Sequence, residues 1–214
     1  MADAMHVQEL VSRARTLGAD RAAPLPARAV VVDERVQLKC RVPLCESYGH
    51  NLMCPPNVPT PDETRAVLAR YSDTLVLQQE IPMTQEGVDI ALAGMGYPEA
   101  KAQEMASKAG RAATATYEVG LKESQNRFAR LMTALEKEAF KMGYRFATAY
   151  AGGECVLCDV CVGPDGDACR HPFEARPSME AVGIDVMATA EAAGLPIELP
   201  AVEHPRWTGL LLLD

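Results

Sequence analysis

The chain has 214 residues, of which 48% are hydrophobic and 23% charged, and its formal net charge is −8. This length is sufficient for one domain with its own core, and the composition is that of a soluble globular protein. The acidic balance argues against a nucleic-acid partner, because phosphate contacts need clustered Lys and Arg, and no such cluster occurs in the sequence. We therefore expect a single domain, residues 1–214, that binds no nucleic acid.

Neither end of the chain indicates a membrane or an export signal. Residues 1–13 lack the apolar core of a secretory signal and have the pattern of an amphipathic helix. The apolar run at 210–213 is far shorter than the roughly 20 residues that a membrane span needs. We expect a soluble, cytoplasmic protein without a membrane partner.

The first half of the sequence predicts two helices and two strands. Apolar residues at helical spacing predict a helix over residues 5–18, with Gly18 as its stop. The run 29–32 is rich in valine and predicts a strand. Thr60 followed by Pro61 predicts a capped helix that runs to about Tyr71. A strand is predicted over 74–81, and an irregular connection or short helix over 82–97.

The second half begins with a long helical region, 98–142, predicted to be interrupted near Gly110 or Gly120 and to end at Gly143. Its apolar stripe indicates a face that packs on the core: Phe128, Leu131, Met132, Leu135, Ala139 and Met142. Strands are predicted over 144–150 and 207–213, and a helix over 177–193. Together these elements predict an α/β fold, a small mixed sheet with flanking helices. The cysteine-rich loops should lie at strand ends and form the metal site or sites.

The seven cysteines fall into two groups. Three lie between positions 40 and 54, which we call the three-cysteine segment, and four between 155 and 169, the four-cysteine segment. Disulfides are rare in the cytoplasm, and structural thiols would be spread over the core. Clustering of this kind indicates metal binding.

Spacing in the four-cysteine segment favours a [4Fe–4S] cluster. Cys155, Cys158 and Cys161 follow one another at three-residue steps, and Cys169 supplies a fourth thiolate. Bacterial ferredoxins use the same opening run, with a further cysteine followed closely by proline. Here the gap to Cys169 is longer, and Pro172 comes three positions after it.

Two other interpretations of this segment stay open. Four thiolates also bind structural zinc, although zinc sites usually take two Cys-x2-Cys pairs separated by a longer loop. Buried or redox-active thiols without a metal are the remaining interpretation. The pair Gly152 and Gly153, just before the first cysteine, allows close backbone approach and amide donors to a cluster, or forms a simple strand-to-loop turn.

The three-cysteine segment has one thiolate fewer than the four that a complete cluster needs. Cys40, Cys45 and Cys54 fit a second cluster with one iron open to solvent, substrate or a non-cysteine ligand. They also fit a single metal ion completed by His50, or packing and redox residues beside the first cluster. We therefore expect one [4Fe–4S] cofactor at the four-cysteine segment and a second at the three-cysteine segment.

Three stretches of the sequence carry a resemblance to a known family: Cys40-x4-Cys45-x2-Tyr48-Gly49-x4-Cys54-Pro55-Pro56, Gly152-Gly153-x-Cys155-x2-Cys158-x2-Cys161, and Arg176-Pro177-Ser178-Met179-Glu180-Ala181. They resemble the bacterial and archaeal proteins classed as domain of unknown function 2284, described as predicted metal-binding proteins. The resemblance spans roughly residues 40–186. It implies a metal or iron–sulfur protein with seven cysteine ligands and supplies no reaction. Pro177 and Ser178 also predict a helix start whose N-terminus faces the cluster.

Three functions follow from these patterns. The first is an iron–sulfur redox protein that passes electrons to a partner protein. The second is an enzyme that uses the open iron on a small-molecule substrate, for sulfur transfer, desulfuration or reductive cleavage. It needs a pocket over the three-cysteine segment and a proton donor such as Tyr48, His50 or a nearby Glu. The third is a zinc or other metal-binding module. The sequence lacks the phosphate-binding, nucleophile-elbow and zinc-protease motifs, which gives other chemistry no support.

Overall fold

One antiparallel sheet organises the fold. The computed structural model of the chain describes residues 4–82, 108–163, 166–198 and 205–214. Its strands are β1 (Arg21–Pro26), β2 (Asp73–Glu80), β3 (Thr148–Tyr150) and β4 (Arg206–Leu213), and they pair in the order β1-β2-β4-β3. In the described part of the chain, no helix is both long enough and apolar enough to cross a bilayer.

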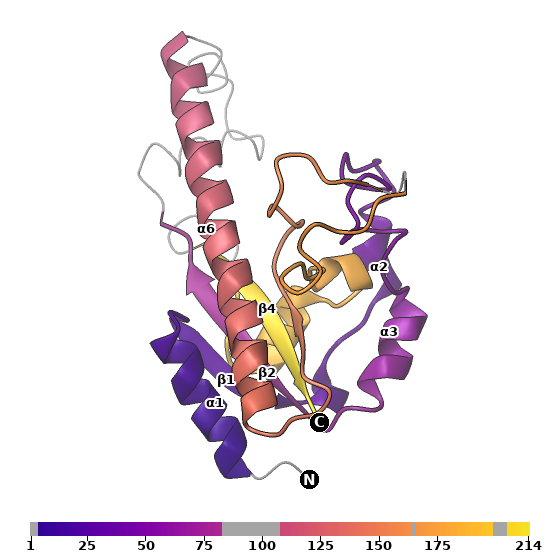
Figure 1. Ribbon diagram of the computed structural model, residues 1–214, viewed down its shortest axis with the longest axis vertical. Coiled ribbons are helices and arrows are strands. Elements are labelled where there is room, and N and C mark those ends of the chain that lie inside the picture. Colours follow the sequence, from indigo (N-terminus) through magenta and orange to yellow (C-terminus); the bar gives the residue numbers. More distant parts are fainter. Residues whose placement is uncertain (1–3, 83–107, 164–165, 199–204) are drawn as a thin grey trace.

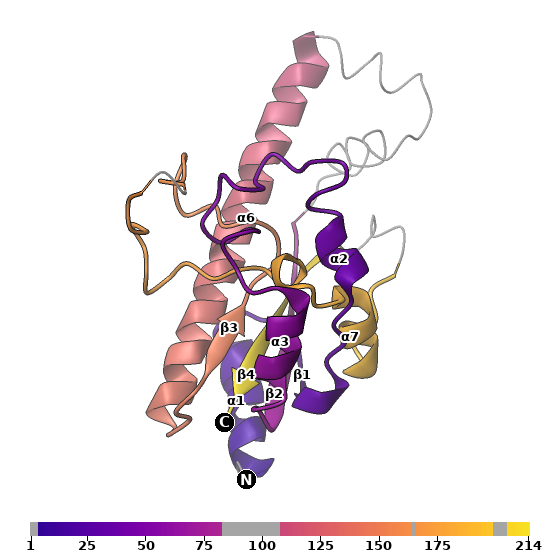
Figure 2. The same cartoon turned by 90° about the vertical axis from the view of Figure 1, so that its right-hand side faces the viewer.

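Helices cover both faces of this sheet (Figures 1 and 2). The helices α1 (Ala4–Thr16) and α6 (Lys108–Lys141) lie on one face. The opposite face carries α3 (Pro61–Leu68), α7 (Val186–Ala192) and the short 3-10 helices η1 (Ala27–Ala29) and η2 (Glu180–Val182). The short helix α2 (Glu34–Leu38) packs against η2. The α/β fold class is thus confirmed.

Two apolar cores sandwich the sheet, and β4 contributes to both. Leu211 and Leu213 pack with Phe128 on the side of α1 and α6, whereas Leu210 and Leu212 pack on the opposite side. A central strand that is covered on both faces needs apolar residues at consecutive positions rather than in alternation. This explains the unbroken leucine run that predicted the last strand.

The apolar stripe of α6 packs on the core, as predicted. Phe128, Met132, Leu135 and Ala139 are fully buried against the sheet and α1. The predicted interruption is wrong, because the helix runs without a break through Gly110 and Gly120. A single glycine costs a helix only about 1 kcal/mol relative to alanine, and the packed stripe offsets that cost. The predicted connection after residue 82 and the helical start at 98–107 lie outside the described residues.

Several other elements follow their local sequence signals. The first helix is followed by Gly18 at φ 110°. Thr60 caps α3 through a capping box, in which its hydroxyl accepts from the Glu63 N–H and Glu63 accepts from the Thr60 N–H. The strands predicted at 74–81 and 207–213 are β2 and β4. The strand predicted over 144–150 is confirmed only at its end, since β3 begins at Thr148.

Three local predictions fail. The run 29–32 is no strand, because Ala29 ends η1 and only Val32 forms a bridge, to Ile184. The helix predicted over 177–193 is absent at its start, where Ser178 instead bridges Ala151 in parallel. The sheet is also not mixed as predicted, because its strands pair antiparallel throughout. Strand β1 was not predicted, because its two prolines disfavour a strand, but it lies at the sheet edge, where proline is tolerated.

Candidate metal centre

The two cysteine segments lie next to each other, and the four-cysteine segment lies beside α6 (Figure 1). The four-cysteine segment leaves the end of β3 directly, as predicted. The three-cysteine segment instead follows α2, so the prediction that it leaves a strand is wrong. Asp33 caps α2 by accepting from the Arg35 N–H, and the Cys40 N–H donates to the carbonyl of Gln37 at 3.0 Å. The first cysteine thus continues the last turn of this short helix.

Asn51 joins the two segments. Its side-chain Nδ2 donates to the Cys155 carbonyl at 2.9 Å, and its Oδ1 accepts from the Met53 N–H at 3.0 Å. The residue is only 7% exposed. The neighbouring Leu52 N–H points at the Cys161 Sγ, 3.5 Å away. Sequence reasoning missed Asn51, whose only signal is a polar residue three positions before Cys54.

Polar side chains of α6 fix the start of the four-cysteine segment. Gln125 Nε2 donates to the carbonyls of Gly152 and Glu154, at 3.2 and 2.6 Å. Asn126 Nδ2 donates to the Val156 carbonyl at 3.3 Å. These bonds hold three alternate carbonyls, those of residues 152, 154 and 156, against one helix, so the loop enters the site along a defined path.

Close packing explains the glycine pair. Gly153 has φ +71°, and a Cβ there would come within 2.5 Å of Gln125 Nε2. A Cβ on Gly152 would lie 3.1 Å from the carbonyl of Thr208 in β4. The pair therefore lets the chain pass between α6 and β4. Its predicted role as a donor to a cluster stays a prediction.

A buried ion pair closes the far end of the segment. The guanidinium of Arg176 binds both carboxylate oxygens of Glu136 on α6, with Nε 3.0 Å from Oε2. The Ala149 N–H donates to the same Oε2 at 2.6 Å. Arg176 thus fixes the chain after the last cysteine to the helix and to β3. No α-helix begins at Pro177, so the predicted helix N-terminus facing the cysteines does not form.

The four cysteines of the second segment line one small cavity with the apolar side chains of Leu157, Val162 and Ala175. All four thiols are free and half-buried. Burial raises the pKa of the Cys155 thiol, and the charges of Cys169, Cys161 and Cys158 raise that pKa further. The His171 N–H lies 3.4 Å from the Cys169 Sγ. The structure therefore brings these four predicted ligands together.

The three cysteines of the first segment also lie near one another. Burial raises the pKa of the Cys54 thiol to about 12, with further contributions from the charges of Glu154, Cys40, Cys45 and Cys155. The Cys45 N–H donates to the Cys40 carbonyl at 3.1 Å. Asn51, three residues before Cys54, donates to the Cys155 carbonyl, so the two cysteine segments are adjacent.

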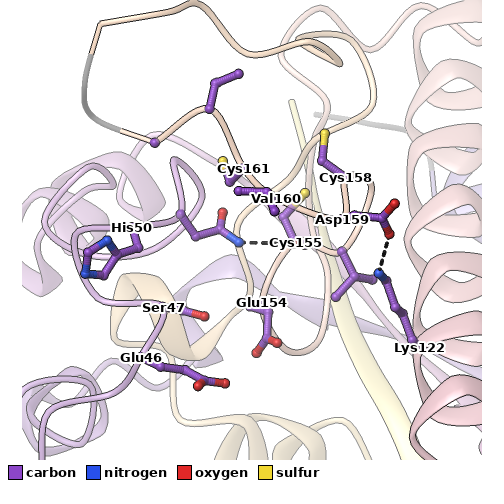
Figure 3. A pocket seen from close by; sticks show the side chains of 14 residues that line it. Glu46, Ser47, His50, Lys122, Glu154, Cys155, Cys158, Asp159, Val160 and Cys161 are labelled. Carbon is purple, nitrogen blue, oxygen red and sulfur yellow. Dashed lines mark hydrogen bonds and ion pairs between the residues drawn. The ribbon is translucent and has the colours of Figure 1, made fainter.

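The seven thiols do not converge on a point. In the part of the chain that the structure describes, no three His, Cys, Asp or Glu side chains lie close enough to hold one metal ion. His50 accordingly completes no single-ion site with the three cysteines. It lines a different space, the pocket of Figure 3. The donor set nevertheless fits an iron–sulfur cluster in kind, because four free thiols share a cavity and two backbone N–H groups point at their sulfurs.

A pocket of about 560 Å³ opens between the two segments (Figure 3). Glu46 and His50 of the first segment line one side, and Cys155, Cys158 and Cys161 line the other. At its α6 edge, Lys122 forms an ion pair with Asp159, whose carboxylate lies 2.9 Å from the Lys122 Nζ. The pocket gives a small molecule access to cysteines of the second segment.

Comparison with curated proteins and with solved structures gives no significant match. A family model does match, over residues 23–213, and it confirms the resemblance carried by the cysteine motifs. The chain is therefore a cysteine-rich member of the family described as predicted metal-binding protein, domain of unknown function 2284.

Proposed function

We propose that this protein is an iron–sulfur redox protein with two clusters. Cys155, Cys158, Cys161 and Cys169 hold a complete [4Fe–4S] cluster. Cys40, Cys45 and Cys54 hold a second one, whose fourth iron takes a non-cysteine ligand. The observation that carries the proposal is the single cavity that all four cysteines of the second segment line.

The surroundings of the thiols support this assignment. When bound, such clusters supply one-electron redox chemistry, and hydrogen bonds to their sulfurs tune the potential. The donors here include the N–H groups of Leu52 and His171, at 3.5 and 3.4 Å from the sulfurs of Cys161 and Cys169. One donor comes from each side of the cavity, so both cysteine segments contribute to the environment of the first cluster.

The positions of the thiols favour electron exchange with a partner protein. Cys45 is exposed, and of the seven cysteines only Cys54 is fully buried. Two adjacent clusters at the surface provide an entry and an exit for electrons. The proposal places the whole chain, as one domain, in the cytoplasm, where reducing conditions keep thiols available for metal.

The pocket of Figure 3 favours a second candidate function, catalysis on a small-molecule substrate. His50 lines this pocket, and in this second function it would serve there as the proton donor. The adjoining thiols, however, are Cys155, Cys158 and Cys161 rather than those of the three-cysteine segment. Substrate chemistry at the pocket would therefore take place beside the complete cluster.

Metal analysis separates these functions from the zinc alternative. Protein purified without oxygen should contain about eight irons and as much acid-labile sulfide per chain. The reduced protein should give the EPR signal of [4Fe–4S] clusters. About four irons would leave one cluster, and zinc without sulfide would overturn the proposal.

Matched cysteine variants assign each cluster to its segment. We expect Cys158→Ser, which leaves three thiolates, to lose at least one iron from the first cluster, and Cys45→Ser, which leaves two, to lose about four; each variant should keep the other cluster intact. Unchanged iron content in either variant would refute the cluster at that segment. Circular dichroism on both proteins checks that the fold is intact.

A further inference from the structure

Glu180 carries a buried carboxyl oxygen that the protein leaves unpartnered. Its Oε2 atom is buried and has no hydrogen-bond partner in the described part of the chain. The Ser178 hydroxyl and a backbone N–H hydrogen-bond to the carboxylate but do not reach this oxygen. A buried polar atom without a partner costs about 1–3 kcal/mol, so its retention in a structure needs an explanation.

The surroundings of Glu180 place it beside the three-cysteine segment. Its helical turn, η2, packs against α2, whose Gln37 donates from Nε2 to the Ala181 carbonyl at 2.8 Å. The Gln37 carbonyl in turn accepts from the Cys40 N–H at 3.0 Å. Burial and the charge of Cys45 raise the pKa of the Cys40 thiol, and the charge of Glu180 raises that pKa further.

The same turn is fixed on its other side to the four-cysteine segment. The Ala151 N–H donates to the Pro177 carbonyl at 2.9 Å, and the Met179 N–H donates to the Ala151 carbonyl at 3.1 Å. Ala151 directly precedes the glycine pair that opens the second segment. Residues 177–180 are therefore held to the start of the four-cysteine segment, and η2, which begins at Glu180, packs against the helix that leads into the three-cysteine segment.

We propose that Glu180 is the fourth ligand of the cluster at Cys40, Cys45 and Cys54, bound through its free carboxylate oxygen. The inference rests on the proposed function, which leaves this ligand unnamed. Each ligand of a cubane binds a separate iron, so the oxygen needs to reach only one corner. Coordination satisfies the orphan oxygen, and a carboxylate is an established iron ligand. An iron capped in this way favours electron transfer over catalysis at an open site.

The test compares Glu180→Gln with Glu46→Gln, a control that removes an exposed carboxylate next to Cys45. Both proteins are purified without oxygen and analysed for iron, sulfide and EPR signal. Because an amide is a poor iron ligand, Glu180→Gln should lose about one of about eight irons and show a [3Fe–4S] signal when oxidised. The control should keep its full iron content.

A second variant, Glu180→Cys, distinguishes ligation from a structural role. It should restore the iron content of the wild type with an altered EPR spectrum, because a thiolate replaces the oxygen. If both variants at Glu180 lose the second cluster entirely and keep the first, Glu180 has a structural role and the inference fails. Loss in Glu180→Gln with rescue by Glu180→Cys supports it.

The wild-type protein separates failure of this inference from failure of the proposed function. A wild type with about four irons or with zinc overturns the second cluster itself. A wild type with about eight irons and a Glu180→Gln variant with the same iron content and EPR spectrum overturns only the role of Glu180.

Discussion

Asn51 is the side chain whose removal should most directly separate the two cysteine segments. Its amide donates to the Cys155 carbonyl at 2.9 Å, and its oxygen accepts from the Met53 N–H at 3.0 Å. Both partners belong to the backbone, and Asn51 itself is 7% exposed. The substitution Asn51→Ala removes both hydrogen bonds and leaves the Cys155 carbonyl and the Met53 N–H without these partners.

The expected cost follows from these two bonds. A protein hydrogen bond contributes about 1 kcal/mol net, and a buried group left without a partner costs about 1–3 kcal/mol. Because water can reach part of this loop region, we take the lower end for each group. Asn51→Ala should therefore lower the free energy of unfolding by about 2–3 kcal/mol. Asn51→Asp keeps the acceptor but loses the donor, and should cost about half as much.

Urea unfolding of the metal-free protein, followed by circular dichroism, measures both changes. Ser47→Ala is the control, because it removes a polar group from the same loop, and within the described residues its side chain makes no hydrogen bond to the second segment. For a chain of this size, 2 kcal/mol corresponds to a fall in melting temperature of about 4–8 °C. A loss below about 0.5 kcal/mol for Asn51→Ala would refute the idea that this residue holds the segments together.

Three further predictions test the supports of the site. Gly153→Ala should lower the free energy of unfolding by about 2 kcal/mol, because its Cβ would displace a hydrogen-bonded glutamine of α6. Gly49→Ala, at a similar positive φ but with open space around it, should lower that free energy less in the same urea assay. Arg176→Met should cost about 3 kcal/mol, since it leaves its glutamate partner buried without a countercharge; a loss under 1 kcal/mol would contradict this reasoning. Asp33→Ala should lower the urea midpoint at pH 7. Hydrogen bonds from Arg35 lower the pKa of Asp33 to about 2. The difference in urea midpoint between the variant and the wild type should therefore shrink as the pH falls from about 4 through about 2. A difference in midpoint that does not depend on pH would exclude this carboxylate as the cause.

The elements predicted from sequence are those whose signal is local. A few neighbouring residues are enough to predict three of these features: the leucine run of β4, the apolar stripe of α6 and the capping box at Thr60. The failures are places where distant contacts override local preference. Pro177 and Ser178 form a good helix start, but pairing with Ala151 gives this stretch an extended path instead. Strand β1 forms despite its prolines because its edge position needs fewer backbone donors.

In the candidate site, too, some features could be predicted from local sequence and others could not. Cysteine is a rare residue, so seven cysteines in two short groups predict a metal centre from sequence alone. The polar residues that position those groups are common types with no local pattern. Asn51 meets the Cys155 carbonyl across 104 residues, and Gln37 meets the Ala181 carbonyl across 144. Such partners become visible only when the fold has brought their segments together.

The fold does not depend on the metal centre for its core. None of the seven cysteines belongs to either apolar cluster that sandwiches the sheet. The cysteine segments are instead attached by hydrogen bonds from Asn51, Gln125 and Asn126 to backbone carbonyls, and none of these bonds involves a thiol. Small zinc domains behave differently, because their binding energy is their folding energy. Removal of metal by a chelator should therefore leave the far-UV circular dichroism of this protein nearly unchanged. Loss of the sheet and helix signal together with the metal would show that the centre, rather than the two leucine-rich cores, holds the molecule together.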